Sequence, residues 1–219
     1  MQESWRKDPD KLTFIACLPL PPYEDFKTTT TIISLSAGQY DAPARMLGDI
    51  NLFITSLVEE EHDCAAAAAN GVGSPSIIVG EIELMIAVKD LQGKGFGRAA
   101  LLAFLRYVVD HEESVLEEYL PGLLLVSDGM EALGRRFEYL RVRIHEGNQR
   151  SLRLFGSMGF RRVGDGEANY FGEVEMRVGG GERTGNGLRE VLGEMLEDNQ
   201  STKLAGYREL RYGVGLEED

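Results

Sequence analysis

The stretch LQGKGFGRAALL, residues 91–102, crowds three glycines and two basic residues directly in front of a helical pattern. A helix start presents backbone N–H groups that have no partner inside the helix, and it carries the positive end of the helix dipole. Glycine lets that backbone approach a phosphate without a Cβ in the way, while Lys94 and Arg98 add positive charge. The stretch is therefore either a plain turn or a loop that binds a negatively charged group.

A strand and a helix are predicted on the two sides of this loop. Residues 76–88 (SIIVGEIELMIAV) alternate as a strand does, and one face carries Glu81, Glu83, Met85 and Ala87. From residue 97 to residue 110, leucines and valines recur at helical spacing. The order strand, glycine loop, helix is typical of phosphate-binding proteins, although neither the dinucleotide fingerprint nor a Walker loop is present.

The rest of the chain is expected to complete one domain over residues 1–178, with insertions near 19–45, 57–75 and 111–136. Further strands are predicted at residues 11–18, 46–55, 137–145, 161–163 and 170–178, and a short one at 31–35. Asn148 is predicted to cap a short helix that Gly159 ends. Residues 179–219 are expected to form a flexible polar tail with a short amphipathic helix, which either docks on the domain or awaits a partner.

The composition is that of a soluble globular protein, with 43% hydrophobic and 27% charged residues. The net charge of −13 comes mostly from residues 59–63, 112–118 and 180–219, which contribute −4 each, so no basic surface for nucleic acid is expected. No run of residues is apolar and long enough to span a membrane, and the polar start predicts no secretory signal. Two cysteines make no disulfide framework and favour a reducing, cytoplasmic location. The cluster EHDC at residues 61–64 fits no zinc spacing, so no metal is expected.

Two sequence blocks resemble a known family. Residues 92–97 (QGKGFG) fit Q/R-x-x-G-x-G/A, the acetyl-CoA motif of the Gcn5-related N-acetyltransferases (GNAT), and residues 148–160 resemble the family's Asn-capped second block. Residues 48–53 and 80–87 resemble the N-acetyltransferase nine-like branch. The resemblance implies an α/β (α+β) fold with a mixed central sheet, flanking helices, and a parallel pair of strands, about 81–88 and 137–145, that splay apart.

The resemblance also implies a site for acetyl-CoA as co-substrate. The pantetheine arm would pair with the backbone of four strand residues: Met85, Ile86, Ala87 and Val88. The pyrophosphate would lie on the glycine loop, formed by Gln92, Gly93, Lys94, Gly95, Phe96, Gly97 and Arg98. Asn148 would face the cofactor from the second helix, and its alternative role is that of a plain helix cap.

The catalytic residues are predicted less directly. Glu81 lies eleven residues before Gln92, where some relatives carry a general base, and Glu83 follows on the same strand face. Both glutamates have the alternative of lining a wet groove that attracts a cationic substrate. Many relatives place a proton-donating Tyr where this chain has Phe155, and Tyr139 and Tyr170 are the substitutes considered.

The implied activity is acetyl-CoA-dependent N-acetylation of a protein or peptide amine, with no nucleic-acid or membrane partner. The alternative is a catalytically weak or inactive binding protein that acts through a partner such as the cytoskeleton. The strand at residues 11–18 resembles the second strand of the family fold, so the chain is expected to lack roughly the first β-α-α portion.

Overall fold

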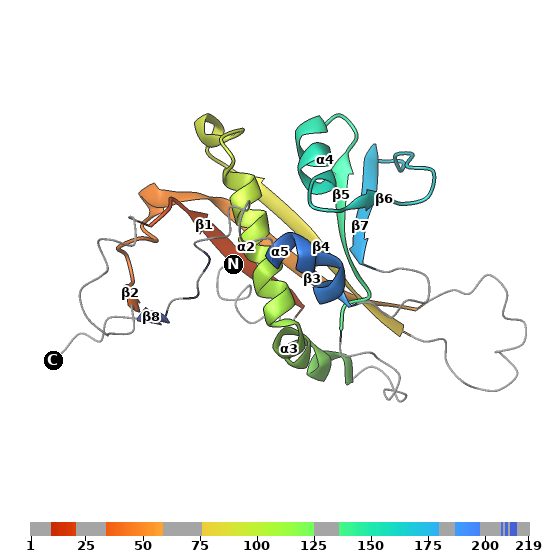
Figure 1. Cartoon of the computed structure of the whole chain (residues 1–219), viewed down its shortest axis with the longest axis horizontal. Helices are drawn as coiled ribbons and strands as arrows, with labels where there is room; N and C mark the ends of the chain where they lie inside the picture. Colours follow the sequence, from red (N-terminus) through yellow and green to blue (C-terminus); the bar gives the residue numbers. More distant parts are fainter. Residues whose placement is uncertain are drawn as a thin grey trace, which may run out of the picture.

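One mixed β-sheet organises the molecule, whose computed structural model describes residues 10–20, 34–58, 76–124, 136–179, 187–197, 207, 209 and 211–213. Six strands form the sheet in the order β1-β3-β4-β5-β7-β6 (Figure 1). Their bounds are Lys11–Cys17 for β1, Met46–Val58 for β3, Ser76–Ile86 for β4, Tyr139–His145 for β5, Arg161–Arg162 for β6 and Glu173–Gly179 for β7. All neighbours run antiparallel except β4 and β5, which are parallel.

The two parallel strands stay together for only a short distance. Their register holds three pairs, Val79 with Tyr139, Gly80 with Leu140 and Glu81 with Arg141. On its other edge β4 pairs with β3 along its whole length, from Ser76 to Ile86. Beyond Glu81 the two ribbons diverge, as Figure 1 shows. The predicted splay of this strand pair is therefore confirmed.

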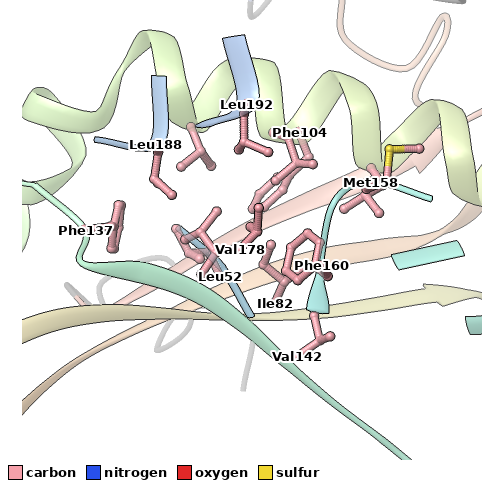
Figure 2. Close-up of a cluster of buried hydrophobic side chains, with 14 of the residues drawn as sticks. Leu52, Ile82, Phe104, Phe137, Val142, Met158, Phe160, Val178, Leu188 and Leu192 are labelled. Atoms are coloured by element: carbon pink, nitrogen blue, oxygen red, sulfur yellow. The ribbon is translucent and has the colours of Figure 1, made fainter. Parts of the chain in front are cut away.

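Helices pack against one face of the sheet and form the core with it. They are α2 (Phe96–Asp110), α3 (Glu112–Leu124), α4 (Gln149–Gly156) and α5 (Leu188–Glu197), and 3-10 turns lie at Pro43–Arg45 and Lys89–Leu91. The core residues shown in Figure 2 come from strands and helices alike, including Leu52, Ile82, Phe104, Phe160 and Leu192. Burial of each such side chain contributes about 1.5–3 kcal/mol. In the described part of the chain no helix combines the length and the apolar character needed to cross a membrane.

Helix α3 differs from the insertion expected at residues 111–136. Its Val115, Leu116 and Tyr119 are buried in the core, and the helix continues through the Pro-Gly pair at residues 121–122 as far as Leu124. The glutamates that suggested a loop lie mostly on the exposed face of this helix. Acidity in this segment therefore reflects one solvated helix face. Residues 57–58 belong to β3, and the rest of the insertion expected at 57–75 lies outside the described residues.

The C-terminal segment also contributes ordered structure. In α5, Leu188, Leu192 and Leu196 are buried, which is the docked arrangement of the predicted helix. Further on, β8 (Arg211–Gly213) pairs in parallel with β2 (Ser34–Ser36) in a separate two-stranded sheet. The expected flexible tail therefore includes a strand at β8. Local sequence does not reveal this pairing, because the partner strand lies near the other end of the chain.

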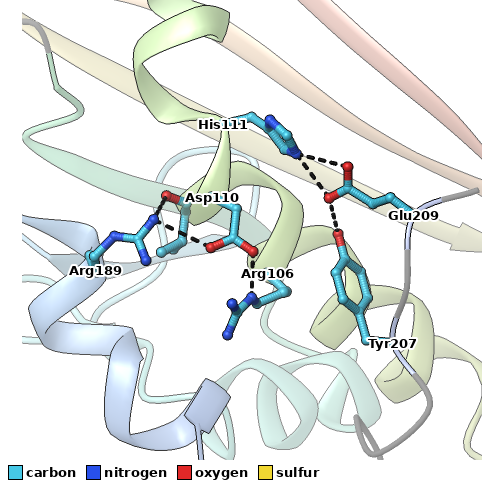
Figure 3. Close-up of polar contacts among 7 residues, drawn as sticks. Arg106, Asp110, His111, Arg189, Tyr207 and Glu209 are labelled. Atoms are coloured by element: carbon cyan, nitrogen blue, oxygen red, sulfur yellow. Dashed lines mark hydrogen bonds and ion pairs between the residues drawn. The ribbon is translucent and has the colours of Figure 1, made fainter.

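Polar contacts fix α5 to the end of α2 (Figure 3). Nη2 of Arg189 donates to the carbonyl oxygen of Val109 at 2.9 Å and lies 3.3 Å from Oδ1 of Asp110. Asp110 also pairs with Arg106 one turn earlier. The Arg189 guanidinium thus satisfies a carbonyl at the C-terminal end of α2, where a helix lacks internal donors.

A second group of contacts ties residues 207 and 209 to the same helix end. The Glu209 carboxylate lies 2.9 Å from Nε2 of His111 and accepts a hydrogen bond from the Tyr207 hydroxyl at 2.8 Å (Figure 3). These two hydrogen bonds lower the pKa of Glu209, and the bond with His111 has the larger effect. Residues 207 and 209 therefore lie against the C-terminal end of α2.

Candidate active site

The glycine loop leads directly into a helix, as the sequence predicted. Helix α2 begins at Phe96, one residue from the predicted start, and its N-cap Gly95 has φ +95°. Gly93 has φ +74°, and a Cβ at either glycine would meet no atom within 4 Å. The requirement for glycine here is therefore conformational, since L-residues rarely adopt positive φ. The side chain of Gln92 donates to the Ile86 carbonyl at 2.8 Å and ties the loop to the end of β4.

A groove of about 650 Å³ lies between this loop, the end of β4 and α4. Its lining residues are Leu84, Met85, Ile86, Leu91, Gln92, Gly93, Gly95, Gly97, Arg98, Asn148, Arg150, Ser151, Arg153 and Leu154. Eight of the predicted cofactor-binding residues are among them: Met85, Ile86, Gln92, Gly93, Gly95, Gly97, Arg98 and Asn148. The structure thus gathers two motifs that are some fifty residues apart in the sequence around one groove.

Four predicted cofactor-binding residues do not line the groove. The backbone of Val88 is already used, since its N–H donates to Leu47 and its carbonyl accepts from Leu91. The N–H of Ala87 also donates to Leu47, at 2.8 Å. The strand ends at Ile86, so the backbone pairing predicted for Val88 is not available in this structure. Lys94 is exposed in the loop, outside the groove lining.

The side chain of Phe96 lies outside the groove. It lines an apolar cavity of about 310 Å³ between α2 and β1, together with Phe14, Phe104 and Tyr107. The start of α2 therefore contacts both hollows, since Phe96 lines the apolar cavity while Gly97 and Arg98 line the groove.

Asn148 has the predicted capping role and a place in the groove. Its Oδ1 accepts the N–H of Ser151 at 3.2 Å, which satisfies one free donor at the start of α4. Gly159 has φ +84° just after this helix, as its predicted role as a stop requires. The cap and groove positions are compatible, because the side-chain amide nitrogen has its own donors.

Glu81 takes part in an ion-pair network. Its side chain is 19% exposed, and Oε2 accepts from Nε of Arg141 at 2.8 Å and lies 3.5 Å from Nη1 of Arg143. Arg143 also pairs with Glu175, which contacts Arg177. Two guanidinium groups therefore occupy the carboxylate of Glu81 at the last pair of residues that β4 shares with β5.

Glu83 lies two residues closer to the groove on the same face of β4. Its side chain is exposed and makes no hydrogen bond or ion pair with any residue that the structure describes. Asn51 stands opposite it in the β3–β4 register and is only 6% exposed. Asn51 accepts from Thr13 at 2.7 Å and donates to Asp49 at 2.6 Å. This polar row was missed from the sequence, although the alternation of residues 46–55 places Asp49 and Asn51 on one face.

Neither tyrosine considered as a proton donor lines the groove, and nor does Phe155, which stands where many relatives have a tyrosine. Phe155 is buried and its ring centroid lies 5.1 Å from that of Phe160. Tyr139 is buried beneath the Arg177 guanidinium, which lies 4.1 Å from its ring centroid. Tyr170 is 97% exposed and contacts Phe171. A groove tyrosine is therefore absent from the described part of the chain.

The parallel strand pair forks beside a glycine loop and an Asn-capped helix, which is the arrangement that the resemblance to the acetyltransferases implied. Residues 5–161 match the family model described as acetyltransferase (GNAT) domain, so the chain belongs to this family. The predicted GNAT fold and family are confirmed, and the chain is an N-acetyltransferase.

Similar proteins identify the branch of the family to which the chain belongs. The N-acetyltransferase 9-like protein of Schizosaccharomyces pombe is 32% identical over 185 residues, which are 81% of this chain and 74% of that protein. The Caenorhabditis briggsae protein of the same name is 32% identical, over 89% of this chain and 70% of its own. Human alpha/beta-tubulin-N-acetyltransferase 9 is 29% identical, over 81% of this chain and 60% of its own. The predicted N-acetyltransferase nine-like branch is confirmed.

Solved structures of acetyltransferases are also similar. Arabidopsis thaliana NAA60, crystallised in complex with acetyl-CoA, gives a TM-score of 0.39 at 12% identity, covering 77% of this chain and 75% of that chain. A domain from Methanocaldococcus jannaschii gives a TM-score of 0.35 at 19% identity, covering 61% of this chain and 56% of that chain.

Proposed function

We propose that this N-acetyltransferase takes its acetyl group from acetyl-CoA and transfers it to an amine of a protein. The observation that carries the proposal is the groove of about 650 Å³, which joins the fork of β4 and β5 to the glycine loop at the start of α2. One end of the groove suits an anion, and CoA carries a pyrophosphate. The other end exposes strand backbone, which suits the amides of the pantetheine arm of CoA.

The pyrophosphate fits the first turn of α2. The first helical hydrogen bond there is donated by Ala99 to Gly95, so the preceding N–H groups have no partner within the helix. Gly93 and Gly95 leave the approach free of side chains, and Arg98 adds a cation. An anion at such a helix start is stabilised by the N–H groups and the dipole together.

The pantetheine arm fits the strand beyond the fork. After Glu81, β4 has no strand partner on its β5 side in the described residues, while Leu84, Met85 and Ile86 line the groove. An extended chain that carries amides can add to such an edge as a strand does. We place the reacting thioester at this edge, near Glu83.

Glu83 is the stronger candidate for the general base. In the reaction the amine nitrogen forms a bond to the thioester carbonyl carbon, the carbon–sulfur bond breaks, and the amine loses a proton. A base needs a free lone pair in reach of that proton. The carboxylate of Glu83 is exposed, whereas that of Glu81 is engaged by Arg141 and Arg143. With Phe155 in the core, the departing thiolate takes its proton from water.

A protein amine is the proposed acceptor class. The human relative carries the name alpha/beta-tubulin-N-acetyltransferase 9, so tubulin is the first acceptor protein to test. The face of the sheet beside Glu83 also carries Asp49, which suits a cationic acceptor.

Gly95→Glu tests the donor half of the proposal, since it puts a carboxylate where the pyrophosphate would lie. Calorimetry should show that CoA affinity is lost while thermal unfolding stays cooperative. Gly164→Glu is the matched control, because Gly164 also has positive φ, at +62°, with no atom within 4 Å of an added Cβ, and lies outside the groove. Equal CoA affinity in both variants would sink the assignment. Turnover of acetyl-CoA with tubulin as the acceptor distinguishes the enzyme from an inactive binding protein.

A further inference from the structure

The groove is positively charged in an otherwise acidic chain. Three arginines, Arg98, Arg150 and Arg153, line it, and its described lining includes no aspartate or glutamate. The whole chain carries a net charge of −13. Since a narrow cleft of one sign concentrates counter-charged ligands, this local excess of positive charge points to an anionic ligand.

Two of these arginines form a pair on α4. Arg150 and Arg153 are three residues apart, so their side chains lie on the same side of the helix. Both are exposed, and neither guanidinium group makes an ion pair or hydrogen bond with any residue that the structure describes. The sheet arginines Arg141, Arg143 and Arg177 all pair with glutamates. The α4 pair is therefore available to a ligand.

The third arginine belongs to the opposite wall. Arg98 lies in the first turn of α2, beside the free N–H groups, and its Nη1 donates to the Ser157 hydroxyl at 2.8 Å. These groups on α2 match one anion, the pyrophosphate. The guanidinium groups of Arg150 and Arg153 stand on the α4 side and remain without an assigned anion.

CoA carries a second anion of its own. Its ribose 3′-phosphate is a monoester with a charge of about −1.5 to −2 at neutral pH. Guanidinium groups bind such a phosphate through charge-assisted, bidentate hydrogen bonds. We propose that Arg150 and Arg153 bind the 3′-phosphate of CoA, so that the enzyme discriminates CoA from 3′-dephospho-CoA. This inference rests on the proposed function, because it deepens the recognition of the same donor.

The test compares the two ligands by calorimetry. The parent protein should bind CoA about 10- to 100-fold more tightly than 3′-dephospho-CoA, the range expected for charge-assisted hydrogen bonds to phosphate. The double variant R150Q/R153Q should lose that factor for CoA and keep the parent's affinity for 3′-dephospho-CoA. Both side chains are exposed, so its thermal unfolding should match that of the parent.

The variant R161Q/R162Q is the matched control. It removes the same charge from two exposed arginines of β6 that lie outside the groove, and it should bind both ligands as the parent does. Equal weakening of both ligands in R150Q/R153Q would assign the pair to the pyrophosphate and overturn the inference, as would unchanged binding of both. A parent that binds CoA without preferring it to 3′-dephospho-CoA overturns this inference alone. A parent that binds neither ligand overturns the proposed donor as well.

Discussion

Glu81 of β4 and Arg141 of β5 form an ion pair at the point where their strands part, with Oε2 and Nε 2.8 Å apart. Both side chains are largely buried, at 19% and 11% exposed. These two residues are the last that pair between the strands, and the groove begins beyond them. A carboxylate engaged by two guanidinium groups stabilises the fork and is less available to accept a proton.

Substitution of the two glutamates separates these roles. Glu83→Gln should lower turnover by about 10²- to 10⁴-fold, the contribution of a positioned base, with acetyl-CoA affinity unchanged. Glu81→Gln removes a charge that faces two arginines and should lower the free energy of unfolding by about 1–3 kcal/mol. Steady-state kinetics, calorimetry and denaturant unfolding on both variants check this. If Glu81→Gln alone loses turnover at unchanged stability, Glu81 is the base.

Gly48 is predicted to be indispensable to the packing of β3 on β4. A Cβ at this position would overlap the backbone oxygen of Met85. Gly48→Ala should therefore lower the free energy of unfolding by about 1–3 kcal/mol, as forced overpacking does. Because Met85 lines the groove, CoA affinity should fall too.

Gly193→Ala is the control for this substitution. Gly193 lies inside α5 with no atom within 4 Å of an added Cβ, so alanine should raise stability by about 0.5–1 kcal/mol through helix propensity. Denaturant unfolding that gave both variants the same sign would contradict the packing argument for Gly48.

Glu112 is predicted to make stability depend on pH. Its carboxylate accepts the N–H of Phe137 at 2.7 Å, and burial raises its pKa despite this hydrogen bond. A raised pKa in the folded state means that the parent loses stability as pH rises from about 4.3, the unfolded value, through the folded value. Glu112→Gln keeps an acceptor and does not titrate. The variant should unfold at a higher temperature than the parent at pH 7, and this difference should vanish below about pH 4.

Glu113→Gln serves as the comparison for Glu112→Gln. Glu113 is the exposed neighbour in the same helix turn. Thermal unfolding at several pH values should show no such pH-dependent difference between this variant and the parent. A Glu112→Gln difference that stays constant from pH 4 to pH 7 would contradict the burial argument.

Local chemistry explains what was predictable from the sequence. The start of α2 and the cap at Asn148 follow from a few neighbouring residues, and both were predicted within one residue. The alternation of β4 likewise identified the face that carries Glu81 and Glu83. These features depend on backbone conformation and period, which short stretches encode.

Long-range features were not predictable in this way. The pairing of β2 with β8 joins segments from opposite ends of the chain, and no local signal marks it. The ion pairs of Glu81 depend on which strand lies beside β4. Arg150 and Arg153 were read as part of a helix block, and only the fork shows that they line the same groove as the glycine loop.

The fork between β4 and β5 has a consequence for the empty protein. A continuous sheet has two edges, but a sheet that divides has a further pair in its interior, and unpaired strand edges recruit strands from other chains. If the donor adds to β4 as proposed, it would occupy the backbone groups that a strand of another chain would otherwise reach. On the proposed function, the acetyl donor would therefore have a second effect, because it would cover an interior strand edge that the fold leaves unpaired.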